Sequence, residues 1–515
     1  MTHRHWIIAV LLAIGIAIAG VFYTSLFGAF AWDDGVLILA NQGIQDFDHL
    51  PKALLSGFWG TAQDMYLVNA VYEQIYRPVV TLAYALQYHF FSTNSFGYHL
   101  VSLCLHVCTS LLAFTWLFRR YRDRASFKTL LVLCTFGALI FALHPSRTES
   151  VAWISGSTDL WMAFFVLLAL LCWQRPFVWW RGLIGTLMFG LALLSKEASV
   201  LAPVVVAYEL WALQGQKRPW AYVLLFVGPV AALVFRQSVV SADVLYQLSF
   251  SVETVQRVLA SLGHYVLAVL FPWEPSAQRA FRYTRCPDGY SYNASIVALG
   301  GAVLLLFLLL FAASFKYKRL RPWLADSLWF FAPLLPVLNV FDLGSSVLIA
   351  ERFLYLPILG LVALFVRTSL FLWRRVLVRT LWIGFSFIAL VGFSLVTSAH
   401  ALHFRSSETL WLYQYEVDPN NKVVIEALAA QFDSRGEINK ALRLFSKGFN
   451  ESLKRCDRPG TVKFSLLALD ALLRHTPSLD QALLSTIRRT YDDVLSNQVI
   501  EINTELLSFS VPLQR

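Results

Sequence analysis

Long apolar runs divide this sequence into regular segments. A helix needs roughly 20 mostly apolar residues to cross the hydrocarbon core of a bilayer. We place about eleven such helices near residues 6–27, 95–118, 127–143, 151–173, 177–194, 199–213, 219–236, 293–315, 322–340, 353–373 and 380–400. The first run is longer than the apolar core of a signal peptide and lacks a small-residue cleavage pattern, so we interpret it as a retained membrane anchor. The pattern predicts a polytopic α-helical membrane protein.

Two further apolar stretches are not expected to cross the membrane. A crossing at 257–272 would move the basic KYKRLR loop at 316–321 to the outer side. We therefore interpret 257–272 as a re-entrant or interfacial helix. The stretch at 78–91 is too short to span and is expected to lie along the interface.

Basic residues are concentrated in alternate loops between the predicted helices. Cytoplasmic loops carry an excess of Lys and Arg, and loops 119–128, 316–321 and 374–379 show it here. The N-terminus is then inside. The segments expected outside are 29–94, 144–150, 195–198, 237–292, 341–352 and 401–515. The formal net charge of +10 is thus mainly a topology signal, and nucleic acid is not an expected partner.

Composition agrees with this interpretation. Apolar residues make up 57% of the 515 residues and charged residues 14%, against about 45–50% and about 25% in soluble proteins. A soluble enzyme has no place for so much apolar surface. A disordered or fibrous chain is also excluded, and 6 cysteines are too few for a disulfide scaffold.

The cysteines fall into two groups. Cys104, Cys108, Cys134 and Cys172 lie in predicted spans, where we interpret them as packing residues. Cys286 and Cys456 are both external, and an oxidising compartment would allow them to form a disulfide. Nothing in the sequence fixes their distance, so the pairing stays open.

Two long regions are expected outside the bilayer. The first is the acidic loop 29–94, which follows the first span, and the second external loop covers 237–292. We divide the chain into a transmembrane domain at 1–400 and an extracytoplasmic helical domain at 401–515. Within the latter, 418–450 predicts two helices joined by a turn at Arg435-Gly436, with facing stripes of Ala427, Ala430 and Phe432 and of Ala441, Leu444 and Phe445. Such spacing suits a TPR-like repeat, and a generic helical tail is the alternative.

Six groups of ionisable residues face the outer side in this topology. They are Trp32-Asp33-Asp34; Tyr76-Arg77-Pro78; His144 to Glu149 with Asp159 in the next span; Ser195-Lys196-Glu197; His264-Tyr265 with Arg279, Arg282 and Arg285; and Glu351-Arg352. Charge at a membrane is costly and usually serves a function. Each group also has a structural interpretation, such as a snorkelling arginine or an interfacial ion pair. Asp159 is expected about two turns into the bilayer, where it needs a partner.

Together the groups suit a phosphate-bearing substrate at head-group level and a nucleophile arriving from outside. The guanidinium group of an arginine can bind a phosphate through two parallel hydrogen bonds. Paired carboxylates can supply a general base or hold a metal. An ion-coupled transporter is less well supported, since transporters tend to place charge at the midplane between repeats, and the sequence shows no internal repeat of that kind.

The order of the motifs resembles a known family. FxWDD, YRP, FGYHLVxxxLH, HPxxTExVAWISGxxDL, LLSKE, ERFLYLP, SETLW and a DPNN-led helical pair follow one another from about Trp32 to about Phe449. This order resembles the TMTC-type (transmembrane and TPR repeat-containing) protein O-mannosyltransferases of the GT-C superfamily. The resemblance implies an inverting transfer of mannose from a polyprenyl-phosphate carrier to Ser or Thr hydroxyls of proteins, on the extracytoplasmic side. It also implies that the TPR region engages the acceptor protein.

The resemblance places the catalytic carboxylate in the first external loop, at Asp33 or Asp34. We expect the carrier phosphate to bind Arg77, Lys196 and Arg352. Residues expected to position the sugar or substrate are His144, Arg147, Glu149, Asp159, Glu197, His264, Tyr265 and Glu351. No cofactor is required by the sequence, and a Mg²⁺ or Mn²⁺ ion on the two aspartates is left open.

Three alternatives stay open at this point. A GT-C enzyme could act on a cell-envelope glycan or lipid, because only one clear helical repeat is present. A non-catalytic membrane scaffold could recruit proteins through its C-terminal helices. For the compartment, we expect a bacterial inner membrane with a periplasmic site, the alternative being an endoplasmic-reticulum membrane with a luminal site.

Overall fold

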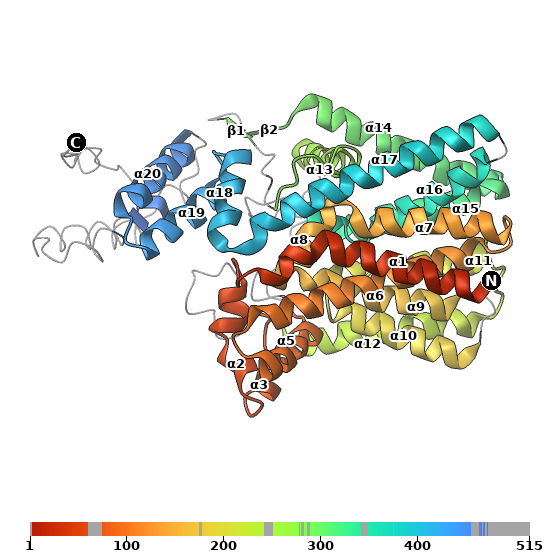
Figure 1. Cartoon of the computed structure of the whole chain (residues 1–515), viewed down its shortest axis with the longest axis horizontal. Coiled ribbons are helices and arrows are strands. Elements are labelled where there is room, and N and C mark those ends of the chain that lie inside the picture. The colour runs from red at the N-terminus through yellow and green to blue at the C-terminus, as the bar shows by residue number, and fades with distance from the viewer. Residues whose placement is uncertain are drawn as a thin grey trace, which may run out of the picture. The chain divides into compact units, whose positions relative to one another are not determined.

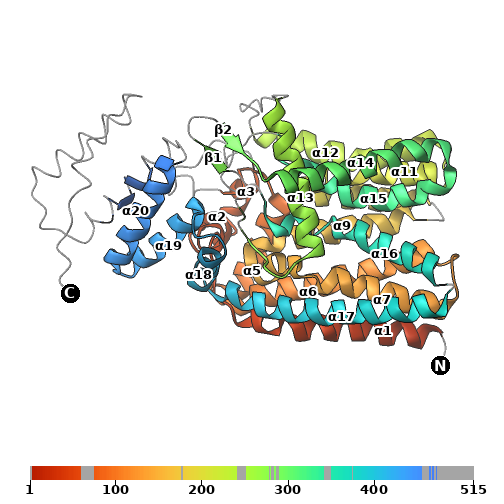
Figure 2. The same ribbon diagram turned by 90° about the horizontal axis from the view of Figure 1, so that it is seen from above.

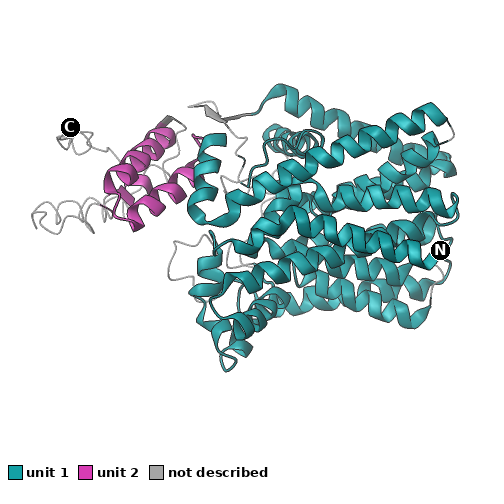
Figure 3. Cartoon of the chain, in the orientation of Figure 1, with its two compact units in different colours: residues 1–282, 291–418 teal, residues 283–290, 419–515 magenta. Residues whose placement is uncertain are grey.

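The computed structural model describes residues 3–59, 75–174, 178–240, 251–277, 279, 283–285, 289–340, 349–373, 375–454, 463–465, 467–468 and 471. The chain forms two compact units, residues 1–282 with 291–418 and residues 283–290 with 419–515 (Figure 3). The first unit therefore continues past residue 400 to Asp418. The predicted pair Cys286 and Cys456, and the loop residues Asp64 and Glu73, lie outside the described residues.

A helix occupies each of the predicted apolar runs. They are α1 (His3–Phe22), α6 (Ser95–Tyr121), α7 (Phe127–Leu143), α9 (Ser157–Trp173), α10 (Trp179–Leu193), α11 (Ala202–Ala212), α12 (Pro219–Val239), α14 (Ala294–Lys316), α15 (Arg321–Leu334), α16 (Ile358–Leu372) and α17 (Val376–Ala401). Most run alongside one another in the first unit (Figures 1 and 2). The apolar side chains of these helices form its main core.

Six helical segments among the described residues are long and apolar enough to cross a membrane. They are His3–Phe27, Ser95–Tyr121, Ile154–Trp173, Pro219–Val239, Ala294–Lys316 and Val376–Arg405. A seventh is counted if Phe127–Leu143 and Pro145–Ala152, which meet at a 53° bend, form one span. The chain is therefore an integral, multi-pass, all-helical membrane protein.

Shorter elements carry most of the charged motifs. Between α1 and α6 they are η1 (Tyr23–Phe27), η2 (Gly35–Leu39), α2 (Gln42–Gln45), α3 (Leu50–Leu54) and α5 (Pro78–Phe91). Between spans lie η4 (Pro145–Arg147), α8 (Thr148–Ala152), η5 (Ile154–Gly156), η6 (Glu197–Ser199), η7 (Lys318–Leu320), η8 (Leu335–Val337) and η9 (Glu351–Leu354). After α17 come η10 (Leu402–Arg405) and α18 (Ser407–Val417).

The segment after α7 was predicted as a loop at 144–150 followed directly by a span from 151, and the structure differs. His144 through Leu160 are all buried. The chain turns at Pro145, forms η4 and α8, extends at Trp153 and turns again through η5, so α9 starts only at Ser157. Asp159 consequently lies in the first turn of α9 rather than two turns inside it, a place where the helix dipole favours a carboxylate.

The apolar stretch expected to be re-entrant or interfacial forms α13 (Val252–Leu270). Figures 1 and 2 show it at a steep angle to the long helices. It crosses α14 closely, because a Cβ added to Gly263 would stand 2.2 Å from the backbone oxygen of Ile296. Only glycine allows this approach.

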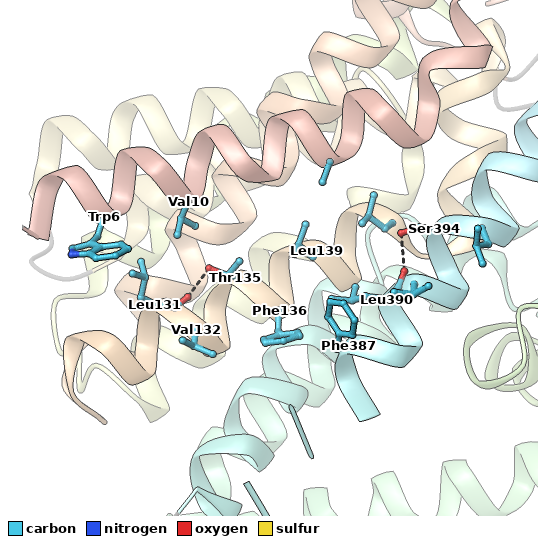
Figure 4. Close-up of a pocket in the computed structure, with 14 residues that line it drawn as sticks. Trp6, Val10, Leu131, Val132, Thr135, Phe136, Leu139, Phe387, Leu390 and Ser394 are labelled. Carbon is cyan, nitrogen blue, oxygen red and sulfur yellow. Dashed lines mark hydrogen bonds between the residues drawn. The ribbon is translucent and has the colours of Figure 1, made fainter. Parts of the chain in front are cut away.

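A cavity of about 560 Å³ lies between α1, α7 and α17 (Figure 4). Its walls are almost entirely carbon, with Trp6, Phe136 and Phe387 among the lining side chains. Thr135 and Ser394 turn their hydroxyls to the backbone oxygens of Leu131 and Leu390. The lining holds no titratable group, so the candidate chemistry lies elsewhere.

The end of α6 that carries Arg120 holds a buried ionic network that the sequence analysis did not single out. Asp326 on α15 accepts hydrogen bonds from Arg120 at 2.6 and 2.9 Å and from Tyr121 at 2.9 Å, and it pairs with Arg367 on α16. Arg120 also pairs with Glu209 on α11 at 2.8 Å. The network joins four helices, and Arg120 belongs to a loop that the charge pattern places inside.

The second unit contains β1 (Tyr283–Arg285), most of β2 (Gly289–Ser291), α19 (Lys422–Ser434) and α20 (Ile438–Lys454). The predicted turn is present, with Gly436 at a φ of 73°. The stripe on α20 is correct, since Ala441, Leu444 and Phe445 are buried.

The stripe predicted for α19 is wrong. Ala430 is exposed, and Ala427 and Phe432 are only partly buried. The buried residues are Val424, Ile425, Leu428, Ala429 and Asp433. The reason is energetic: Val424, Ile425 and Leu428 remove more apolar surface from water than alanines do, and they decide which face turns inward.

Candidate active site

The segment that follows α1 presents Asp33 and Asp34 in very different environments. Trp32, which precedes them, has a φ of 54°, a left-handed conformation that is uncommon for a bulky residue. Asp34 is fully buried. Its Oδ2 accepts the backbone N–H of Ala31 at 2.9 Å, and its Oδ1 accepts the backbone N–H of Ser155 at 2.8 Å and the Ser155 hydroxyl.

These bonds fix the position of Asp34. Both of its carboxylate oxygens accept hydrogen bonds, and these tie the segment after α1 to η5 ahead of α9. Trp153 strengthens the same junction, because its indole N–H donates to the backbone oxygen of Ala31 at 3.1 Å. Burial nevertheless raises the pKa of Asp34 to about 7.

Asp33 is only partly buried, and no side chain among the described residues donates a hydrogen bond to its carboxylate. Burial raises the pKa of Asp33 to about 7, against the attraction of Arg352, while the charges of Asp34 and Glu149 raise it further. A partly accessible carboxylate with a pKa near neutrality can accept a proton at physiological pH.

Arg352 and Glu149 form the central ion pair. The backbone N–H of Arg352 donates to Glu149 Oε2 at 2.9 Å, and its guanidinium binds Oε1 of the same carboxylate. The guanidinium lies over the rings of Trp32, Trp153 and Phe353, at 5.8, 5.5 and 5.0 Å from their centroids. Three aromatic faces and one carboxylate therefore hold this cation in place.

Two more ion pairs lie close to Arg352. Lys196 Nζ bonds Asp159 Oδ2 at 2.6 Å, and it lies 4.9 Å from the same Phe353 ring that Arg352 covers. Burial lowers the pKa of Lys196 to about 8, with Asp159 acting in the opposite direction. Arg77 Nη2 bonds Glu197 Oε2 at 3.0 Å. The three cations predicted to bind phosphate are thus brought together, each paired with one carboxylate.

Arg147 and His144 hold the backbone of this region. Arg147 is fully buried and donates to the carbonyl oxygens of Tyr355 at 2.6 Å and Leu354 at 2.7 Å. His144 bonds the Ser146 hydroxyl at 2.9 Å and the backbone oxygen of Val269 at 3.1 Å. In the structure their contacts hold the ERFLYLP segment and the end of α13, and their predicted role in positioning substrate stays a prediction.

The remaining predicted residues border the group. Glu351 is buried, and Ser276 donates its backbone N–H to Oε1 at 2.9 Å. Burial raises the pKa of Glu351 to about 8, and the Ser276 N–H opposes that rise. Tyr265 on α13 is fully buried, whereas His264 beside it is partly exposed.

Sequence reasoning missed several contacts of Trp32, the residue that precedes Asp33. Trp153 stacks on Trp32 with centroids 4.5 Å apart, and Trp411 meets the Trp32 ring edge-on at 5.1 Å. Ser407 accepts the Trp32 backbone N–H at 2.9 Å. The SETLW string was recognised only as part of the motif order, and nothing in one sequence places residue 407 beside residue 32.

The structure also bears on whether the two aspartates could bind a metal ion. Among the described residues, no group of three or more His, Cys, Asp or Glu side chains is placed to hold an ion. Both oxygens of Asp34 already accept N–H or O–H donors. A two-aspartate site would have to share those oxygens with the donors that already bond them.

Comparison with known proteins identifies relatives. The chain is 35% identical to the protein O-mannosyl-transferase Tmtc1 of Drosophila melanogaster over 190 residues, which cover 36% of this chain and 21% of the relative. It is 22% identical to TMTC3 of Mus musculus over 471 residues, covering 83% of this chain and 49% of the relative. This chain is a homologue of the TMTC protein O-mannosyl-transferases. No protein-family model matches it.

The homology agrees with the motif order, and it has a limited extent. The alignment with TMTC3 spans about half of that relative's length. Among solved structures, the oligosaccharyltransferase of Archaeoglobus fulgidus tethered to an acceptor peptide matches with a TM-score of 0.41 and 13% identity, over 82% of this chain and 59% of that one. Likeness at that level does not assign a fold.

Proposed function

We propose that this chain is a membrane glycosyltransferase that moves mannose from a polyprenyl-phosphate carrier to a Ser or Thr hydroxyl of an extracytoplasmic protein. Homology to TMTC protein O-mannosyl-transferases supports the reaction class. The observation that carries the mechanism is the contrast within the acidic motif. Asp34 is bonded through both oxygens, whereas the Asp33 carboxylate accepts no side-chain hydrogen bond from the described residues.

The transfer step follows from this contrast. The acceptor hydroxyl oxygen forms a bond to C1 of mannose as the bond between C1 and the phosphate oxygen breaks, and the bonding electrons leave with the phosphate. Asp33 takes the hydroxyl proton. The attack inverts C1 and passes through an oxocarbenium-like state. The products are a mannosyl-protein and polyprenyl phosphate.

The cation cluster serves the leaving group. The carrier phosphate changes from a diester to a monoester, so its negative charge grows as the bond breaks. Arg352, Lys196 and Arg77 can stabilise that charge without acting as acids. Their carboxylate partners offset the charge of the three cations, which limits the cost of burying them.

Topology and acceptor recognition complete the proposal. We infer that α10, α11, α15 and α16 also cross the bilayer, giving about eleven spans with the N-terminus inside and Asp33 outside. The outer side is the periplasm of a bacterial inner membrane or the lumen of the endoplasmic reticulum. The helical pair α19–α20 is a TPR-like element that would bind the acceptor protein.

A donor-exchange assay tests the proposed reaction. Purified protein in vesicles is given a Ser/Thr peptide and radiolabelled mannose, carried either on a polyprenyl phosphate or on a nucleoside diphosphate. We expect labelled peptide from the lipid-linked donor only. Equal labelling from the nucleotide donor, or labelling of lipid instead of peptide, would contradict the proposal.

The pH dependence of kcat gives a second test. The base must be ionised, and Arg352, Asp34 and Glu149 are the charged groups facing it. Burial raises the Asp33 pKa to about 7. At saturating donor, kcat is therefore expected to be low at pH values below about 7, where Asp33 is protonated, and to increase as the pH rises through about 7. A rate that stays constant down to pH values of about 5 would argue against Asp33 as the base.

A further inference from the structure

We propose that Ser407 and Trp411, on the helix that follows the last span, are positioning residues that hold Trp32 in its left-handed conformation and thereby aim the Asp33 carboxylate. This inference rests on the proposed role of Asp33 as the base. It gives the SETLW motif a function that its sequence position, far from the acidic loop, does not reveal.

The backbone at Trp32 needs external support. A bulky residue in the left-handed region is strained and persists only where its surroundings enforce the conformation. Trp32 has a φ of 54°. Its N–H donates to the Ser407 Oγ at 2.9 Å, a contact between residues 375 positions apart in the chain. Ser407 is the first residue of α18, so a helix end fixes the acceptor.

The Trp32 ring is held from two sides. Trp153 stacks on it with an interplanar angle of 12°, and Trp411 meets it edge-on at 73° with the centroids 5.1 Å apart. Trp411 is only 2% exposed. An edge-to-face pair of this kind is directional as well as apolar, so Trp411 restricts the rotation of the Trp32 ring.

Other contacts of the same segment tie it to neighbouring loops. The backbone N–H of Ala29 donates to the Arg405 carbonyl oxygen at 2.8 Å. The Tyr413 hydroxyl donates to the Pro275 carbonyl oxygen at 2.8 Å, and Ser276 donates its hydroxyl to Gln414 Oε1 at 3.0 Å. The segment η10–α18 therefore binds two external loops, and it provides a rigid support for the acidic motif.

Asp33 depends on that support more than its neighbours do. Asp34 is aimed by its own hydrogen bonds, but among the described residues no side chain donates to the Asp33 carboxylate. The backbone conformation at Trp32 therefore sets the direction of the Asp33 carboxylate. A displacement of about 1 Å at a reacting group can cost about 10²-fold in rate. Ser407 and Trp411 thus act on catalysis without touching the substrate.

Three variants of adjacent serines separate positioning from helix stability. Ser407→Ala removes the acceptor of the Trp32 N–H, and Ser407→Thr keeps a hydroxyl there. Ser406→Ala is the matched control, because Ser406 caps α18 by accepting the Thr409 N–H at 3.2 Å and has no contact with Trp32 in the described hydrogen bonds. Each full-length protein is assayed in vesicles with polyprenyl-phosphate mannose and a Ser/Thr peptide.

We expect Ser407→Ala to lower kcat about 10-fold with little change in the donor KM, since it disturbs the base and leaves the cations in place. Ser407→Thr should restore most of the rate, and Ser406→Ala should stay within about twofold of the wild type. Trp411→Ala should likewise lower kcat about 10-fold with little change in the donor KM, and Trp411→Phe should restore part of the lost rate.

Equal losses in Ser406→Ala and Ser407→Ala would show that only helix stability matters and would overturn the inference. So would a wild-type kcat in Ser407→Ala. Asp33→Asn is assayed in parallel. An active Asp33→Asn protein would show that Asp33 is not the base. An inactive Asp33→Asn protein together with a fully active Ser407→Ala protein would show that only the positioning role is wrong.

Discussion

An Asp33→Asn variant is expected to lose about 10²- to 10⁴-fold in kcat, the usual contribution of a general base. The amide keeps the size of the carboxylate but cannot take the acceptor proton. The loss should appear in kcat with little change in the donor KM, because the cations that bind phosphate are untouched. Because no side chain among the described residues donates to the Asp33 carboxylate, the variant should fold and purify like the wild type.

Two companion variants sharpen this prediction. Asp48→Asn makes the same chemical change at an exposed position of the same loop and should keep full activity. Asp34→Asn removes an acceptor for buried N–H and O–H groups, and the cost of leaving such groups unpaired is about 1–3 kcal/mol each. It should lower the unfolding temperature as well as the rate. Retained wild-type turnover in Asp33→Asn would show that another group is the base.

Replacing Asp326 by alanine is expected to produce the largest loss of stability in the chain. Asp326 is fully buried and is the shared acceptor for Arg120, Arg367 and Tyr121. Its removal leaves two partly buried guanidinium groups short of a partner, with Glu209 alone still pairing Arg120. Breaking a buried ion pair from one side costs about 3–5 kcal/mol.

Thermal unfolding in detergent, followed by tryptophan fluorescence, measures this effect. The control is Asp123→Ala, which removes an acid whose pairing with Arg122 is solvent-exposed, with side-chain exposures of 59% for Arg122 and 85% for Asp123. An exposed pair contributes about 0–1 kcal/mol, so this variant should unfold near the wild type. Identical unfolding temperatures for the two variants would mean that the network does not hold the four helices together.

The helices and charged segments could be predicted because both follow from local rules. Each apolar run contains a helix, since runs of that length have to be helical in a bilayer. The cost of placing charge at a membrane singled out Asp159, Lys196 and Glu149, which form buried ion pairs in the structure. The same rule applied to Asp326 and Glu209, which also lie inside apolar runs, would have found the second network.

The partners could not be predicted because they are set by tertiary packing. Glu149 and Arg352 are 203 residues apart, and no sequence pattern links them. The different environments of Asp33 and Asp34 depend on Ser155 and Ala31, which carry no signal of their own. The late start of α9 was missed because the apolar pattern continues through Trp153 and Ile154, while the backbone turns there.

The most direct test of the central claim counts both products of one reaction. Wild-type protein and Asp33→Asn are incubated with polyprenyl-phosphate mannose and a Ser/Thr peptide, and mass spectrometry measures mannosylated peptide and released polyprenyl phosphate. The account predicts that the wild type forms the two products in equal amounts and that Asp33→Asn forms neither at a comparable rate. Mannosylated peptide formed by Asp33→Asn at the wild-type rate, or formed without release of polyprenyl phosphate, would contradict it.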